Sequence, residues 1–209
     1  MFKVIRMAKR GDKLPAEFRQ EWLERNRELR KTAGKLLASV IAEGNILPGE
    51  PLFHGVALLY YPTINEARAV HEKPLGKDAI SVIADERTVF EKTGASYKPM
   101  GQLKVILTDV RRKDLTPAQF KTEASKVYAK VESKAMIDAG VQKMVVNFSQ
   151  AEKGKDPAFD TMLELYFNEK DDVKAAFGSP VIGLLRKDEE TLVQLDAPEI
   201  RIVAEESTL

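Results

Sequence analysis

Apolar and polar residues alternate through 161–167, as expected for a β-strand whose two faces meet different surroundings. Large apolar residues at every second position would pack against a layer of helices: Leu163, Leu165 and Phe167. The intervening residues would point to the opposite face: Met162, Glu164 and Tyr166. Because a glutamate and a tyrosine are too polar for an apolar core, this strand predicts a lumen that holds water or a ligand.

Two longer segments have the periodicity of helices that begin at a proline. The expected buried stripes are Phe18, Trp22 and Leu29 after Pro15, and Phe120, Ala124, Val127 and Val131 after Pro117. A capping box, Thr116 with Gln119, opens the second helix. Each helix would end at a glycine with positive φ, Gly34 or Gly140. The second proline and glycine are four residues further apart than the first, so we expect the second helix to be one turn longer.

These helices belong to a repeat that runs along the chain. Short matches recur after a shift of 101 to 106 positions: Lys3-Val4-Ile5 as Lys104-Val105-Ile106, Tyr60 as Tyr166, Pro74 as Pro180, and Asp85-Glu86 as Asp188-Glu189. A shift that is constant within elements and changes between them indicates duplication followed by small insertions. We therefore predict two similar halves, residues 1–100 and 101–209.

Each half has the predicted order β-α-β-β-α-β, which is the ferredoxin-like pattern of an α+β fold. The remaining strands are expected near 2–8, 36–43, 55–61, 141–148 and 199–204. Shorter helices would follow the third strands, opened by Thr63 and by Glu169, with further helical stretches near 76–84 and 181–187. Because helices would cover only one face of each sheet, we expect the two sheets to pack together as a closed or nearly closed barrel with helices outside.

Composition narrows the classes of partner. The 33 basic and 32 acidic residues are interspersed and give a net charge of +1, which argues against a nucleic-acid or membrane-surface protein. The absence of cysteine excludes disulfides and thiolate chemistry. No apolar run approaches the ~18 residues of a membrane span, and no secretory signal is evident. We expect a cytoplasmic protein, and we find no sequence motif for a metal, a nucleotide or any other cofactor.

Three segments resemble the EthD-like family of the dimeric α/β-barrel superfamily: 15–26, 159–167 and 175–180. The resemblance covers nearly the whole chain through the two copies. It implies a small-molecule pocket between the sheets, reactions that often need no cofactor, and a homodimer of the two-repeat chain as one assembly. Many helices of the family carry a histidine where this chain has Asn26. Because asparagine does not exchange a proton near neutral pH, a mechanism that depends on that histidine is in doubt here.

The candidate catalytic residues are Tyr60, Glu164, Tyr166 and His54. For each tyrosine the alternative to a lumen donor is packing. Glu164 is a base with a pKa raised by burial or, in the interpretation that we prefer, the partner of Lys104 in an ion pair on the adjacent strand. His54 opens a strand, where a structural role is commoner than catalysis. We expect the other histidine, His71, to be solvated.

The candidate ligand-binding residues are Lys104, Arg6, Asn26 and Trp22. Two functions remain open: conversion of a small aromatic or ketone-like compound without a cofactor, and a non-catalytic binding or structural barrel. A cavity of ~300 Å3 with convergent polar groups would favour the enzyme. A filled lumen would favour the second function, with these residues inside: Ile5, Met7, Leu58, Ile106 and Met162. We expect the larger polar pocket on the side of the second half, beside Lys104, Glu164 and Tyr166.

Overall fold

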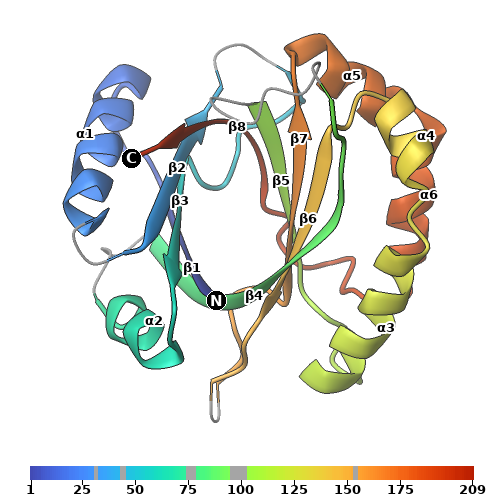
Figure 1. Ribbon diagram of the computed structural model, residues 1–209, viewed down its shortest axis with the longest axis horizontal. Helices are drawn as coiled ribbons and strands as arrows, with labels where there is room; N and C mark the ends of the chain where they lie inside the picture. The colour runs from blue at the N-terminus through green and yellow to red at the C-terminus, as the bar shows by residue number, and fades with distance from the viewer. Residues whose placement is uncertain (31–32, 43–45, 74–78, 95–102, 153–154) are drawn as a thin grey trace.

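The strands of the chain form a closed barrel with helices outside it (Figure 1). The computed structural model describes residues 1–30, 33–42, 46–73, 79–94, 103–152 and 155–209. The strand order around the barrel is β1-β3-β2-β8-β5-β7-β6-β4. The α+β class and the barrel predicted from the sequence are therefore confirmed.

The first half contributes four strands and two helices: β1 (Phe2–Ala8), α1 (Pro15–Leu29), β2 (Lys35–Ile41), β3 (Gly55–Tyr61), α2 (Ile64–His71) and β4 (Ala79–Glu91). The second half contributes β5 (Leu103–Asp109), α3 (Pro117–Ala129), α4 (Ser133–Asp138), β6 (Lys143–Ser149), β7 (Thr161–Phe167), α5 (Lys170–Gly178), α6 (Pro180–Glu189) and β8 (Arg201–Thr208). Helices α1 and α2 lie on one side of the barrel in Figure 1, and the helices of the second half lie on the other.

Each half has the strand order of a ferredoxin-like sheet, with its first and third strands in the centre. The order is β4-β1-β3-β2 in the first half and β8-β5-β7-β6 in the second. The edges then join across the halves, because β4 pairs with β6 and β2 pairs with β8. The two sheets are thus one continuous ring, which leaves no unpaired edge along most of its length.

Several local predictions were wrong. Residues 79–84 are the start of β4 and not a helix. The sequence match of Asp85-Glu86 with Asp188-Glu189 therefore aligns residues of a strand with residues of helix α6. Helix α3 has 13 residues against 15 in α1, and the extra residues of the second half lie around the separate helix α4. Gly140 has a positive φ of 100°, whereas Gly34 is not among the glycines with positive φ. Pro74 and the boundary predicted at residues 100 and 101 lie outside the described residues.

Apolar side chains form one cluster inside the barrel and one beneath the helices of each half. The alternation predicted for β7 is confirmed: Leu163, Leu165 and Phe167 belong to the cluster beneath the second-half helices, and Met162 belongs to the cluster in the lumen. Phe18 and Trp22, on the buried face of α1, belong to the corresponding cluster of the first half. Burial of apolar surface on both faces of the sheet therefore stabilises the ring.

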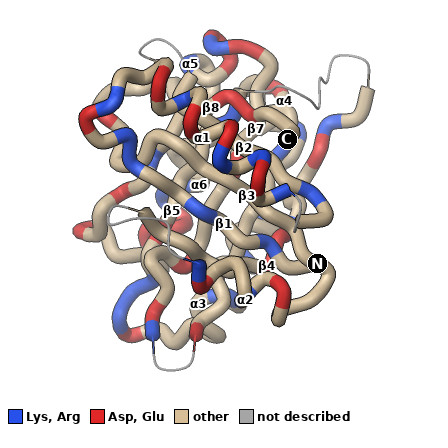
Figure 2. The backbone as a smooth tube through the Cα atoms, turned by 90° about the vertical axis from the view of Figure 1, so that its left-hand side faces the viewer, with Lys and Arg blue, Asp and Glu red and all other residues tan. Residues whose placement is uncertain are grey.

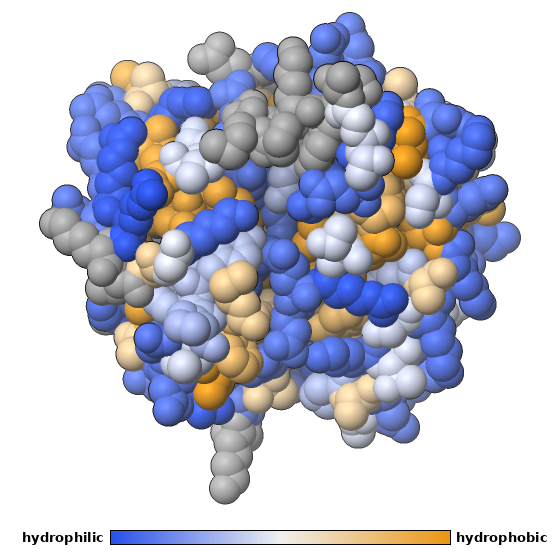
Figure 3. All heavy atoms as spheres, in the orientation of Figure 1, coloured by the Kyte–Doolittle hydropathy of each residue, from blue (hydrophilic) through white to orange (hydrophobic). Residues whose placement is uncertain are grey.

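The surface carries both signs of charge. Basic and acidic segments are interspersed along the chain trace (Figure 2), and apolar residues on the face seen in Figure 3 form small patches separated by hydrophilic ones. Among the described residues, no helix combines the length and apolar character needed to cross a membrane.

Candidate functional site

Two buried lysines meet one buried glutamate inside the barrel. Lys3 on β1 and Lys104 on β5 have 1% and 0% of their surface exposed, and Glu164 on β7 has 0%. Lys3 Nζ lies 2.8 Å from Glu164 Oε1, and Lys104 Nζ lies 2.8 Å from Glu164 Oε2. The ion pair between Lys104 and Glu164 predicted from the sequence is confirmed, and a second lysine from the other half completes it.

Two further glutamates extend this cluster on opposite sides. Lys3 also pairs with Glu86 on β4, and Lys104 Nζ lies 2.5 Å from Glu206 Oε2 on β8. We call the cluster of Lys3, Glu86, Lys104, Glu164 and Glu206 the ionic layer. It lies near the starts of β1 and β5, and therefore near one end of the barrel.

The tyrosines at equivalent positions of the two halves, Tyr60 and Tyr166, donate hydrogen bonds to the ionic layer. Tyr60 Oη donates to Glu86 Oε2 at 3.0 Å, and Tyr166 Oη donates to Glu164 Oε2 at 3.1 Å. Asn147 Nδ2 also donates to Glu164 Oε1, at 2.9 Å. With two ammonium groups, an amide and a phenol around it, the Glu164 carboxylate is well satisfied, as a buried charge must be.

These contacts set the protonation states. Burial alone would raise the pKa of Glu164, but the neighbouring ammonium groups of Lys104 and Lys3 outweigh it and hold that pKa well below its usual range. Burial and the nearby carboxylates raise the pKa of Tyr166 well above its usual value. Glu164 therefore stays ionised and Tyr166 stays protonated near neutral pH. The alternative in which burial raises the pKa of Glu164 and makes it a base is wrong.

The rest of the lumen is filled by apolar side chains. The five residues named above as possible fillers are all fully buried and belong to one cluster: Ile5, Met7, Leu58, Ile106 and Met162. In Figure 3, viewed as in Figure 1, side chains occupy the centre of the ring. The polar cluster is also not confined to the second half, because Lys3 is as close to Glu164 as Lys104 is. The larger polar pocket expected on the side of the second half is therefore not observed, because both halves contribute to the polar cluster.

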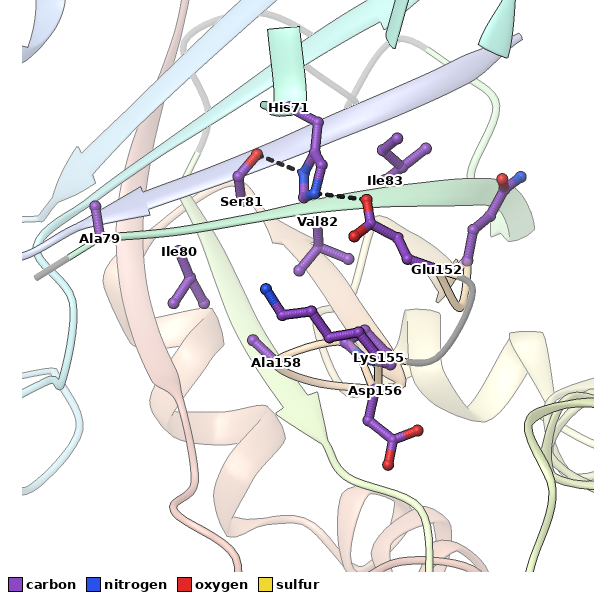
Figure 4. Close-up of a pocket in the computed structure, with 12 residues that line it drawn as sticks. His71, Ala79, Ile80, Ser81, Val82, Ile83, Glu152, Lys155, Asp156 and Ala158 are labelled. Atoms are coloured by element: carbon purple, nitrogen blue, oxygen red, sulfur yellow. Dashed lines mark hydrogen bonds and ion pairs between the residues drawn. The ribbon is translucent and has the colours of Figure 1, made fainter. Parts of the chain in front are cut away.

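A cleft of about 300 Å3 lies at the other end of the barrel, beside the start of β4. It is lined by His71, residues 79–83 of β4, and residues 150, 152 and 155–158 of the connection between β6 and β7 (Figure 4). We call it the His71 cleft. It lies where the halves meet, because β4 belongs to the first half and the connection to the second.

The strand pairing explains why a cleft forms here. Residues 79–83 pair with β1, but the pairing of β4 with β6 begins only at Ala84, opposite Ser149. Beyond that point the β6–β7 connection diverges from β4. Arg111 holds the far side of the connection, with Nη2 2.6 Å from Asp156 Oδ1 and Nη1 2.6 Å from Asp160 Oδ1. The junction between the two halves therefore stays open beside residues 79–83 of β4.

His71 lies between a hydroxyl and a carboxylate in this cleft. Its Nδ1 is 2.9 Å from Ser81 Oγ on β4, and its Nε2 is 2.8 Å from Glu152 Oε1 on the connection (Figure 4). The side chain of His71 is 19% exposed, so the expectation of a solvated histidine was wrong. An ionised carboxylate accepts from Nε2–H, and this leaves Nδ1 of a neutral imidazole as the basic nitrogen. No sequence signal pointed to His71, because its partners come from two distant segments.

Of the other predicted site residues, Trp22, Asn26 and His54 lie apart from both places, whereas Arg6 pairs with Ser81 in the sheet and lies beside the His71 cleft. Trp22 and Asn26 lie on the buried face of α1, on the outer side of the sheet, where Trp22 Nε1 donates to the Val56 carbonyl oxygen and Asn26 Nδ2 donates to the Trp22 carbonyl oxygen. Arg6 Nη2 donates to the carbonyl oxygen of Lys73. His54 precedes β3, with Nε2 3.2 Å from Glu50 Oε1. The structure therefore does not bring Arg6, Asn26 or Trp22 together with Lys104, nor His54 together with Glu164.

In the part of the chain that the structure describes, no group of three or more His, Asp or Glu side chains has the arrangement to hold a metal ion.

Residues 112–196 match the family model of the EthD domain. The match lies within the second half of the chain and covers less than half of its length. A search of curated protein sequences gave no match. The fold of the chain resembles several solved structures. It is similar to an anthrone oxidase-like protein with a TM-score of 0.63 and 10% identity, over 99% of this chain and 92% of the other. It is also similar to chlorite dismutase from Candidatus Nitrospira defluvii, with a TM-score of 0.52 and 13% identity, over 98% and 90% of the two chains. At such identities the likeness concerns the fold alone.

Proposed function

We propose that this EthD-like barrel binds a small aromatic or ketone-like compound in the His71 cleft, and that His71 exchanges a proton with it without a metal or nucleotide. The observation that supports this proposal is an imidazole held between Ser81 and Glu152 at the wall of a cleft of about 300 Å3. The lumen, where the candidates Tyr60, Glu164 and Tyr166 lie, is filled and has no comparable role in the proposal.

The walls of the cleft suit a compact ligand with one polar end. Ile80, Val82 and Ala158 offer apolar surface, and His71, Ser81 and Lys155 offer polar atoms (Figure 4). A volume of about 300 Å3 is at the lower end of the range for ligand sites, which suits a compound built around a single ring.

The hydrogen bonds of His71 suit a general base. Glu152 fixes the ring through Nε2, as the orienting group of a base commonly does. Once the Ser81 hydroxyl rotates away from Nδ1, that nitrogen can accept a proton from the ligand. Glu152 would also stabilise the imidazolium that forms when the proton is transferred.

Hydrogen exchange at a ketone tests this proposal. Acetophenone in D2O should lose its methyl hydrogens faster with the protein than without it, as followed by proton NMR. His71→Gln should reduce the protein-dependent rate on the order of a hundredfold, the usual contribution of a positioned base. The chain has two histidines, so His54→Gln is the matched control and should keep the rate. Equal rates for His71→Gln and the unchanged protein would overturn the proposal.

A second function is favoured by the filled lumen: a barrel that binds ligands without converting them or that serves assembly. In that case acetophenone would bind without exchange, or would not bind at all. A cytoplasmic location and a homodimer of the two-repeat chain stay part of the proposal. Size-exclusion chromatography with light scattering would test the homodimer.

A further inference from the structure

A hydroxyl, an imidazole and a carboxylate form a continuous chain of hydrogen bonds along the wall of the His71 cleft. Ser81 Oγ, on β4, is 2.9 Å from His71 Nδ1, at the end of α2. His71 Nε2 is 2.8 Å from Glu152 Oε1, on the β6–β7 connection. A serine beside a base that a third group orients is the arrangement of an activated nucleophile. We infer that Ser81 is a nucleophile and that the substrate class of the cleft is a small aryl or alkyl ester.

This inference rests on the proposed function, since it assigns the same base and the same cleft. It adds the group that attacks and the bond that breaks. The two ring nitrogens have exchanged places relative to serine hydrolases, in which the hydroxyl meets Nε2 and the carboxylate meets Nδ1. The exchange leaves the chemistry intact, because each nitrogen of a neutral imidazole can serve as the acceptor when the other carries the proton.

The reaction has two steps with balanced atoms. In the first, Ser81 Oγ forms a bond to the carbonyl carbon, its proton passes to His71 Nδ1, and the ester C–O bond breaks as the leaving oxygen takes that proton. In the second, water attacks the acyl carbon, its proton passes to Nδ1 and then to Ser81 Oγ, and the acid departs. The sum is one ester and one water giving one acid and one alcohol, with no redox change.

A cation and apolar residues also line the cleft, the apolar residues of β4 on the face opposite to Ser81. Lys155 extends from the β6–β7 connection toward β4, and Ile80 and Val82 lie on either side of Ser81 in sequence (Figure 4). An ammonium group in a cleft would stabilise the oxyanion that forms on the carbonyl oxygen. A short acyl chain or a single ring matches the volume of about 300 Å3.

Acylation by p-nitrophenyl acetate tests the inference. The full chain should release p-nitrophenol in a burst close to one equivalent, and mass spectrometry of its peptides should place one acetyl group on Ser81. Ser81→Ala should lose the burst, and His71→Gln should slow it on the order of a hundredfold. Glu152→Gln should slow it less, because Glu152 acts through His71. The matched control is Ser207→Ala, a strand serine on β8, which should keep the burst.

The remaining outcomes decide between the inference and the proposed function. Ser81→Cys keeps a nucleophile at the same place and should restore acylation, which a variant that fails to fold would not do. Acetyl groups found on Lys155 and not on Ser81 would overturn the inference. So would a burst that His71→Gln leaves unchanged. If acetophenone exchange depends on His71 while Ser81 stays unmodified, the inference fails and the proposed function stands.

Discussion

Lys3 Nζ and Glu164 Oε1 lie 2.8 Å apart across the barrel, although 161 positions separate them in the sequence. Lys3 belongs to the first half of the chain and Glu164 to the second, so this ion pair connects the two halves inside the lumen. Both groups are removed from water, and the second lysine, Lys104, comes from the same half as Glu164. The ionic layer is therefore a contact between the halves as well as the polar end of the lumen.

Replacing the shared carboxylate should destabilise the fold strongly. Glu164→Leu leaves two buried ammonium groups without their common partner, and such changes cost about 3–5 kcal/mol. Urea unfolding followed by circular dichroism would measure the loss. The matched control is Asp138→Asn, which breaks the exposed pair of Asp138 with Lys134 and should change stability by less than about 1 kcal/mol. A Glu164→Leu protein as stable as the unchanged one would show that the ion pairs contribute nothing net.

A second buried carboxylate should make stability depend on pH. Glu189 on α6 accepts from Tyr128 Oη at 2.9 Å and shares Arg186 with Asp109. Burial, together with the nearby Asp109 carboxylate, raises the pKa of Glu189 from 4.5 to about 7. The folded state therefore holds a proton that the unfolded chain releases. Stability from this group is fully present below the unfolded pKa and is lost as pH rises toward 7, by on the order of 1–3 kcal/mol.

Glu189→Gln tests that dependence, since an amide of the same shape does not titrate, although it can accept from only one of Tyr128 and Arg186. The free energy of unfolding, measured between pH 4.5 and 7, should fall less steeply with pH in this variant. Its exposed neighbour provides the control: Glu190→Gln should leave the slope unchanged. Identical slopes in all three proteins would contradict the raised pKa of Glu189.

A glycine at the start of β3 should tolerate no side chain. A Cβ at Gly55 would lie 2.8 Å from Trp22 Cε2, which is too close for any real contact. Because Trp22 packs from α1 against the sheet, neither the ring nor the strand can shift freely, and Gly55→Ala should cost about 1–3 kcal/mol. Gly34→Ala is the control, since its Cβ would meet only the Tyr60 carbonyl oxygen, at 3.6 Å. Thermal melts that place both variants at the same midpoint would contradict this packing.

The fold could be predicted from the sequence because its signals are local and occur twice. The alternation of β7, the capping boxes at Thr63 and Thr116, and the helix stripe at Phe18 and Trp22 each follow from spacing within one segment. The prediction failed where the halves have diverged. The first half enters β4 at Ala79, where the second half continues as α6, so a helix could not be transferred from one copy to the other.

The candidate sites show the same limit. The pair of Lys104 and Glu164 was predictable because their strands are adjacent in a ferredoxin-like sheet. Lys3 joined it only through the packing of the two halves into one ring, whereas Glu206 lies on β8 beside β5, beyond the strand expected at 199–204. His71 could not be found, since Ser81 follows in another element and Glu152 comes from the other half. A site formed where two repeats meet produces no recognisable motif in the sequence of either repeat.

The most direct test of the account is to map where a small aromatic ligand binds. Methyl-labelled protein titrated with acetophenone and followed by carbon–proton NMR should show the largest shifts at Ile80 and Ala158 of the His71 cleft. The lumen methyl groups of Leu58, Ile106 and Met162 should stay unchanged, because the lumen is already filled. Shifts concentrated at Leu58, Ile106 and Met162, with the cleft unaffected, would contradict the account and place the ligand inside the barrel.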